Sequence, residues 1–290
     1  MQIDRLVAEH KFLLTKLSIT ELLDRIRKFR RLNILNLNDE ELSHEIQKVL
    51  FVDQKYIARV YSREFSAGDV FFRARKAENL TIPVACASKE NDAWAAPPQV
   101  VVKYSRLNRV GESILYTSFA NPNVSLKEIR MDVGGFAVVF AYRAKRKIVA
   151  VSMGEKFIDP AYDQDEVNKI NIINDFLYDE FTRDVGVGTE YLYRTSDIIA
   201  KWWFDGPPDL QDAWFYPSIK SQEHFNVAFR PGKSRDCLEL RGVMLGRLIA
   251  EDNFSITSVG ILKNERFEYA PVGSDLQKKI FPEIEFARRS

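Results

Sequence analysis

Four polar side chains stand in stretches of the sequence that are otherwise apolar, and their types suit binding and cleavage chemistry. Arg73 lies in VFFRAR, Arg106 opens RLNRVGESILYTS, Glu128 ends NVSLKE and Ser218 lies in WFYPSIKS. A charged group is costly to bury unless it meets a partner or a ligand. Arginine presents a planar fork of donors that suits phosphate, and a carboxylate can stabilise a positive charge that develops in a transition state. These residues are therefore the first candidates for a functional site.

Each candidate also has a purely structural explanation. Glu128 ends the stretch Ser-Leu-Lys-Glu, which has the spacing of a helix capping box. Tyr116, in the same stretch as Arg106, fits a core aromatic residue with a bonded hydroxyl. Arg73 and Arg106 fit ion-paired residues at a strand edge. Ser218 follows a proline and fits the start of a turn. Residue types alone therefore leave both interpretations open.

Several common kinds of site are excluded or disfavoured by the residues present. The chain has three histidines, His10, His44 and His224, and two cysteines, Cys86 and Cys237, without the paired spacing of a zinc site. The cysteines fit two reduced thiols, and His224 fits a structural or minor pocket residue. The sequence also lacks a phosphate-binding P-loop, a dinucleotide G-x-G-x-x-G pattern and a G-x-S-x-G nucleophile elbow. We therefore expect no metal cofactor.

Composition and charge describe a folded chain without a strong charge bias. The 290 residues include 42 basic and 41 acidic side chains, and 46% are hydrophobic. The formal net charge of +1 argues against a dedicated nucleic-acid binder, which relies on clustered basic charge. The first residues carry charges and lack the apolar core of a signal peptide, and the longest apolar run, 136–142, is too short to span a membrane. We expect a cytoplasmic protein without membrane partners.

The first 64 residues have helical patterns. Residues 20–32 place apolar side chains near the i, i+3, i+4 and i+7 spacing of one helix face, with Ser18 or Thr20 as the cap, and a second helix is expected over 39–51. The first of these helices carries five basic residues, Arg25, Arg27, Lys28, Arg30 and Arg31. They fit either a solvated helix face or a surface for an anionic partner.

From about residue 65 the pattern predicts strands with helices between them. We expect strands over 70–75, 100–104, 113–118, 136–143, 147–153, 213–217 and 225–230, and strand-like segments after 236. Strands 136–143 and 147–153 flank a short basic turn and resemble a hairpin. Helices are expected after Asn121-Pro122, over 165–183 and over 196–204, with a short amphipathic end at 276–281.

These elements do not alternate regularly, which favours an α+β fold over an α/β fold. We divide the chain into a helical N-terminal segment (1–64), a central domain (65–235) and a β-rich C-terminal extension packed on that domain (236–290). The N-terminal segment is expected to serve regulation, oligomerisation or partner docking.

The order of the candidate motifs resembles the RES domain, a family named for an arginine, a glutamate and a serine. FFRAR, then RLNxxGESILYTS, then SLKEIR, then FYPSxxxxxxFNVAF occur in that family's order over residues 65–235. Arg109 stands where the family often has a proline. The resemblance implies a fold similar to ADP-ribosyltransferases and an enzyme that consumes NAD, which is expected as its substrate.

The resemblance also assigns roles to individual residues. It implies that Glu128, Arg106, Tyr116 and Ser218 are catalytic. The carboxylate of Glu128 would stabilise the oxocarbenium-like ribose when the nicotinamide bond breaks. Arg106 and Tyr116 would bind the diphosphate and the nicotinamide ring, and Ser218 would bind the ribose or the amide. Two further residues, Arg73 and Asn226, are expected to help bind NAD.

We therefore expect a toxin-like enzyme that depletes NAD with water or phosphate as acceptor, so an antitoxin or another inhibitory protein is an expected partner. Three alternatives stay open. The same site could transfer ADP-ribose to a protein or other macromolecule, or the domain could bind a nucleotide without catalysis. The third alternative is a protein-interaction scaffold that binds its partner through the basic helix. A homo-oligomer is a further open expectation.

Overall fold

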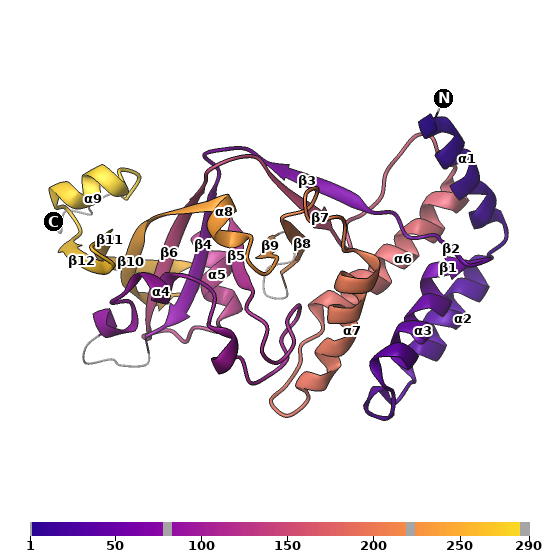
Figure 1. The fold of residues 1–290 in the computed structure, drawn as a ribbon, viewed down its shortest axis with the longest axis horizontal. Coiled ribbons are helices and arrows are strands. Elements are labelled where there is room, and N and C mark those ends of the chain that lie inside the picture. The colour runs from indigo at the N-terminus through magenta and orange to yellow at the C-terminus, as the bar shows by residue number, and fades with distance from the viewer. Residues whose placement is uncertain (1, 78–82, 219–223, 285–290) are drawn as a thin grey trace.

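The computed structural model describes residues 2–77, 83–218 and 224–284, which form helices around a mixed sheet (Figure 1). The predicted α+β class is confirmed. The α-helices are α1 (Gln2–Thr15), α2 (Ile19–Arg30), α3 (Asp39–Leu50), α4 (Glu90–Ala93), α5 (Pro122–Glu128), α6 (Gln164–Thr182), α7 (Tyr193–Ile198), α8 (Ser234–Cys237) and α9 (Asp275–Ile280). Shorter turns are η1 (Ile34–Asn36), η2 (Pro83–Cys86), η3 (Pro98–Val100), η4 (Glu190–Leu192) and the π-helical η5 (Ile199–Trp203), which continues α7.

Ten strands form one sheet in the order β12-β11-β10-β6-β4-β5-β9-β8-β7-β3, and every neighbouring pair is antiparallel except β7 and β8. They are β3 (Tyr61–Phe65), β4 (Val70–Lys76), β5 (Leu115–Phe119), β6 (Phe136–Ala144), β7 (Ile148–Ser152), β8 (Ala213–Pro217), β9 (Phe225–Phe229), β10 (Leu238–Ala250), β11 (Asn253–Lys263) and β12 (Arg266–Pro271). A separate pair joins β1 (Phe51–Val52) to β2 (Lys55–Tyr56).

The sheet folds back on itself so that its two halves face each other. Strand β6 ends at Ala144 and β7 begins at Ile148, yet the two strands are separated by four others in the sheet. So short a connection requires the halves to approach each other. The core between them is apolar and rich in aromatic rings, and Phe71 of β4 packs edge-on against Phe229 of β9 with centroids 5.7 Å apart.

Two predictions for this region are wrong. Residues 136–143 and 147–153 do not form a hairpin, because β6 pairs with β4 and β10 while β7 pairs with β3 and β8. Residues 100–104 do not form a strand, although they are rich in β-branched residues. Val102 is 71% exposed there and follows the turn η3, so the segment has no sheet surface to fit.

Helices cover the outer face of one half of the sheet (Figure 1). Helix α2 begins at the predicted cap Ser18, whose hydroxyl accepts the amide of Glu21, and α3 begins with a capping box at Asn38. The apolar face of α2 includes Phe29, whose ring meets that of Phe176 on α6 edge-on at 5.3 Å. These helices share one core with β7, β8 and β9. The N-terminal segment is therefore an integral layer of the fold.

The predicted helical segment also ends earlier than residue 64. Helix α3 stops at Leu50, and β1, β2 and β3 follow it before residue 66. The tight turn at Asp53 and Gln54, both with positive φ, joins β1 to β2. Strand β3 then pairs with β7 at the edge of the large sheet, so residues 61–65 belong to the sheet and not to the helical layer.

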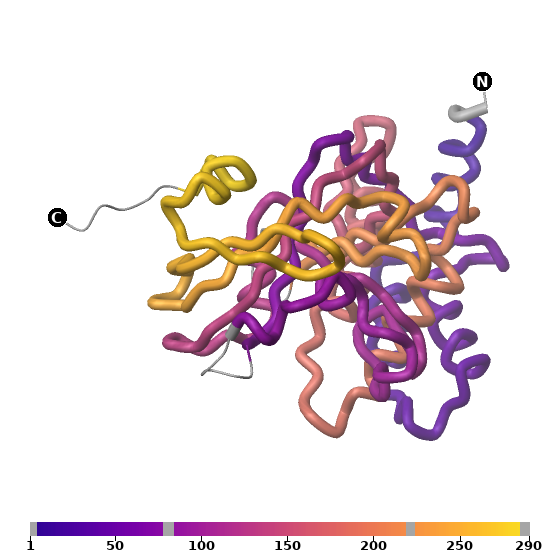
Figure 2. Tube along the Cα trace, turned by 60° about the vertical axis from the view of Figure 1, so that its left-hand side comes forward, coloured from indigo at the N-terminus to yellow at the C-terminus, as the bar shows by residue number. Residues whose placement is uncertain are grey.

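The C-terminal residues extend the same sheet. Strand β10 pairs along β6, and β11 and β12 continue outward from it. Helix α9 and α5 cover the outer face of this half, where Ile280 and Leu126 enter one apolar cluster. Figures 1 and 2 both show α9 at the opposite end of the molecule from α1. Among the described residues, no helix is both long and apolar enough to cross a membrane.

Candidate functional site

A cavity of about 270 Å³ opens where β4 and β5 separate. These strands pair only at two positions, Phe71 with Phe119 and Phe72 with Ser118, and then diverge. Helices α5 and α7 and the ends of β8 and β9 complete the walls. The lining residues are Arg73, Ala74, Ser105, Arg106, Tyr116, Thr117, Ser118, Ser125, Glu128, Ile129, Tyr193, Tyr216 and Asn226.

Glu128 is the last residue of α5 and reaches the cavity wall. Its Oε1 accepts hydrogen bonds from Ser218 Oγ at 2.5 Å and from Asn226 Nδ2 at 2.8 Å. Within the described part of the chain, no hydrogen bond or ion pair reaches Oε2. Two donors on one oxygen orient the carboxylate and leave its second oxygen for another group.

The capping-box interpretation of Glu128 is wrong. Helix α5 begins at Pro122 with Asn121 as its cap, so Glu128 lies at the opposite end of the helix. The hydroxyl of Ser125 donates instead to the carbonyl of Pro122 at 2.7 Å. A carboxylate at the C-terminal end of a helix opposes the local dipole, so Glu128 does not stabilise α5 there.

Ser218 and Asn226 are brought together by the antiparallel pairing of β8 and β9. Tyr216 lies opposite Asn226 in this register, and the Ser218 amide donates to the carbonyl of His224 at 2.8 Å. Both donors to Glu128 are buried. His224 itself lies beside Asn121, the N-cap of α5, and its Nε2 is 3.4 Å from Asn121 Nδ2.

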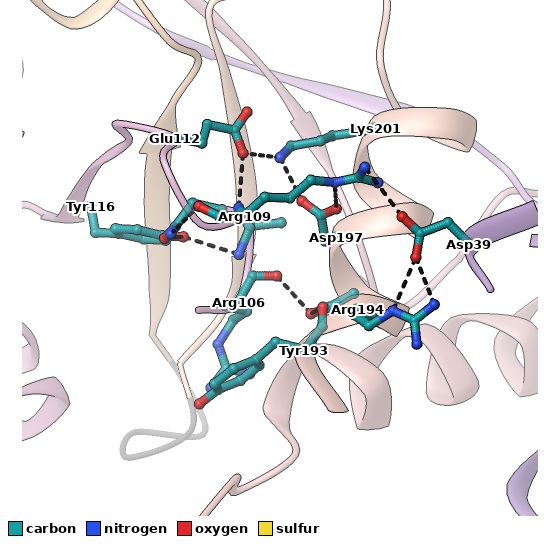
Figure 3. Close-up of polar contacts among 12 residues, drawn as sticks. Asp39, Arg106, Arg109, Glu112, Tyr116, Tyr193, Arg194, Asp197 and Lys201 are labelled. Carbon is teal, nitrogen blue, oxygen red and sulfur yellow. Dashed lines mark hydrogen bonds and ion pairs between the residues drawn. The ribbon is translucent and has the colours of Figure 1, made fainter. Parts of the chain in front are cut away.

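Arg106 occupies the second position of a tight turn over 105–108. A hydrogen bond of 3.0 Å, which the Ser105 amide donates to the Asn108 carbonyl, closes this turn. Its residue surface is only 8% exposed. The guanidinium carbon lies 5.4 Å from the ring centroid of Tyr193 (Figure 3). Its Nη1 is buried and has no hydrogen-bond partner within the described residues. A buried guanidinium nitrogen without an acceptor is suited to an incoming anion.

Tyr116 uses its hydroxyl to hold the turn that carries Arg106. The hydroxyl accepts the Leu107 amide at 3.0 Å, donates to Asn108 Oδ1 at 3.0 Å and lies 3.1 Å from Ser105 Oγ. Burial raises the pKa of Tyr116 well above its usual value, so the phenol stays protonated. Its ring lines the cavity, whereas its polar end stabilises the arginine turn.

The guanidinium of Arg73 does not join the polar groups around Glu128 and Arg106. Its Nη1 donates to three carbonyls at the end of α4, the closest being that of Trp94 at 2.9 Å. The guanidinium lies 6.0 Å from the ring of Phe140, which belongs to the core between the sheet halves. Burial lowers the pKa of Arg73. Arg73 therefore borders the cavity, while its charged end is engaged on the opposite side of β4.

Two tyrosines of the cavity were not predicted. Tyr193 begins α7 and supports Arg106, and no spacing in the sequence marks it. Tyr216 stands two residues before Ser218, so strand alternation places both side chains on one face. That alternation, within the FYPS stretch, was a usable signal. Burial raises the pKa of Tyr216 well above its usual value.

The described residues contain no group of three or more histidine, cysteine or acidic side chains placed to hold a metal ion. No protein-family model, no curated protein and no solved structure matches the chain. The geometry of this cavity and the order of the motifs are therefore the features of the chain that bear on its function.

Proposed function

We propose that this protein cleaves the bond between nicotinamide and ribose in NAD, with water or inorganic phosphate as the acceptor. The observation that carries the proposal is the carboxylate of Glu128, which Ser218 and Asn226 hold through one oxygen on the wall of a polar cavity. The order of motifs that resembles the RES domain supports it.

In this reaction the C–N bond breaks and its electron pair leaves with neutral nicotinamide. Positive charge develops on the ribose, and a fixed carboxylate beside the anomeric carbon stabilises that charge. Glu128 Oε2 is suited to this role because Oε1 is already engaged. The acceptor then adds to the ribose and loses a proton.

Arg106 is suited to bind the diphosphate of NAD. Its buried Nη1 without a partner within the described residues suits a diphosphate oxygen, which is the anionic part of NAD. Tyr193 supports the guanidinium through its ring face. Tyr116 fixes the turn through its hydroxyl and presents its ring to the cavity. Arg73 is assigned a structural role in this proposal.

The direct test is nicotinamide release from NAD by the purified protein, with and without phosphate, beside the Glu128→Gln variant. The amide keeps the size of the side chain and removes its charge. We expect release by the wild type and a loss of about 100-fold or more in the variant, because one electrostatic group of this kind commonly contributes that much. Dependence on phosphate would identify the acceptor.

Two alternatives are outcomes of the same experiment. Radiolabelled NAD whose label becomes fixed on a macromolecule would instead identify an ADP-ribosyltransferase. Tight NAD binding by a folded protein, without release or transfer, would identify a nucleotide-binding module and overturn the enzymatic proposal. An enzyme that depletes NAD also requires restraint in the cytoplasm where NAD is used, so we propose an inhibitory protein such as an antitoxin as its partner.

A further inference from the structure

Helix α7 holds the turn that carries Arg106 at several points. Tyr193 places its ring against the guanidinium, and Ser196 Oγ donates to the Arg106 carbonyl at 2.6 Å. Asp197, the residue after Ser196, accepts from Arg109 Nε with its Oδ2 at 2.6 Å (Figure 3). Arg109 follows Arg106 by three residues, so the helix fixes both ends of this short stretch.

Asp197 is the centre of this contact. Its side chain is 1% exposed, and it pairs with Lys201 at 2.5 Å as well as with Arg109. Lys201 also pairs with Glu112, whose Oε2 accepts the Arg109 amide at 3.0 Å. A buried carboxylate is costly unless it is paired, so its partners are held where it lies. Asp197 thereby holds residues 106–112 directly through Arg109 and, by way of Lys201, through Glu112.

The N-terminal helices join the same network through Asp39 at the start of α3. Asp39 pairs with Arg109 Nη1 at 3.2 Å and with Arg194 Nη2 at 2.7 Å. Arg194 belongs to α7 and also donates to the Leu37 carbonyl at 2.9 Å. Figure 3 shows Arg109 extended between the acidic groups of α7 and α3. The N-terminal layer therefore contacts the arginine segment itself.

We propose that Asp197 and Asp39 are positioning residues for Arg106, so that the N-terminal helices complete the anion-binding half of the cavity. The segment 105–112 has no strand or helix of its own, and its shape depends on Tyr116, α7 and Asp39. Arg106 has no carboxylate partner among the described residues to fix its place. The identity of the anion as the NAD diphosphate rests on the proposed function.

The test uses the full-length Asp197→Asn and Asp39→Asn variants and two readouts besides activity. Inorganic diphosphate and ADP-ribose serve as probes in calorimetric titrations, and hydrogen exchange reports on the amides of 105–112. For Asp197→Asn we expect faster exchange there and about tenfold weaker binding of both probes, because displacement of a binding group by about 1 Å can cost up to 100-fold. Asp39→Asn should have the same effects at smaller size.

The matched control is Asp212→Asn. Asp212 is also an acidic group with a side chain only 9% exposed, and it pairs with Arg146 at 2.8 Å, but it does not line the cavity. This variant should lose stability without a change in probe affinity. On an Arg109→Ala background, Asp39→Asn should weaken binding less than it does in the wild type, because Arg109 is one of the two arginines, with Arg194, through which Asp39 acts.

Unchanged exchange and unchanged probe affinity in folded Asp197→Asn would overturn the positioning role while leaving NAD cleavage intact. Probe binding that depends on Arg106 and Asp197, in a protein that releases no nicotinamide, would keep the positioning role and reject the proposed function. A wild type that binds neither probe would also overturn this inference.

Discussion

Glu128 and Ser218 are separated by 90 positions in the chain, yet Ser218 Oγ donates to Glu128 Oε1 at 2.5 Å. One residue ends a helix on the outer face of the sheet, and the other follows the buried strand β8. The contact therefore depends on the packing of α5 against the sheet. Because the hydroxyl orients the carboxylate, the pair should act as a unit.

The first prediction concerns this pair. Ser218→Ala removes one of the two donors on Glu128 Oε1, so we expect nicotinamide release at saturating NAD to fall about 10- to 100-fold. Ser125→Ala is the matched control, because it removes a hydroxyl from the cavity wall whose one hydrogen bond among the described residues goes to the Pro122 carbonyl. Equal rates for the Ser218 variant and the wild type would reject the role of this contact.

The second prediction separates the two arginines. Arg73→Met keeps the aliphatic stem and removes a donor from three carbonyls near α4. The carbonyls of Asp92 and Ala93 keep donors in Arg75 and Tyr142, whereas the Trp94 carbonyl keeps none among the described residues, so the free energy of unfolding should fall by about 1–3 kcal/mol. The KM for NAD should change by less than about twofold. Arg106→Met should instead raise that KM strongly. A large increase in KM for the Arg73 variant, with stability unchanged, would return Arg73 to the binding site.

The third prediction concerns pH and the docking of α1. His10 Nε2 lies 2.9 Å from the Ile57 carbonyl, and burial lowers the pKa of His10 below its usual value of 6.5. Between the folded and unfolded pKa values the unfolded chain binds more protons, so the stability contribution is present above pH 6.5 and is lost as pH falls. Wild-type protein should therefore lose more stability than His10→Gln between pH 7.5 and 5.

Denaturant unfolding at a series of pH values measures this difference. His44→Gln is the matched control, because it makes the same substitution at an exposed position of α3. A stability difference between His10→Gln and wild type that stays constant with pH would contradict the prediction.

The fourth prediction tests whether the N-terminal helices belong to the main core. Phe29→Ala should lower the free energy of unfolding by about 3–5 kcal/mol, because Phe29 is buried against Phe176 of α6. Phe12→Ala makes the same change at an exposed position of α1 and should cost less than about 0.5 kcal/mol. Independent unfolding of the N-terminal segment in the Phe29 variant, with the rest of the chain intact, would contradict a shared core.

Sequence patterns predicted the elements better than their arrangement. The apolar spacing around Ile26 and a cap at Ser18 are sufficient to predict α2, and runs of aromatic and apolar residues are sufficient to predict β8 and β9. The pairing of β6 and β7 was mispredicted because neighbouring position in the chain was taken for neighbouring position in the sheet. Local propensity carries no information about which distant strand completes a pair.

The site was predictable to a similar extent. The motif order selected Glu128, Ser218 and Asn226, and the structure places them in contact, while their chemical roles stay predictions. Tyr193 was missed because its contact with Arg106 depends on the packing of α7. Arg73 is predicted for the site because its strand neighbours are apolar, yet its Nη1 donates to carbonyls at the end of the short helix α4.

The position of β9 in the sheet has a consequence for synthesis of the chain. Strand β9 lies between β5 and β8 and carries Asn226, so residues through Phe229 must leave the ribosome before β5 and β8 are joined in the sheet. Pairing between such distant segments is slow, because the intervening loop must close first. A nascent chain therefore lacks both donors of Glu128 until residues 218 and 226 have been made, and on the proposed function it consumes no NAD before then.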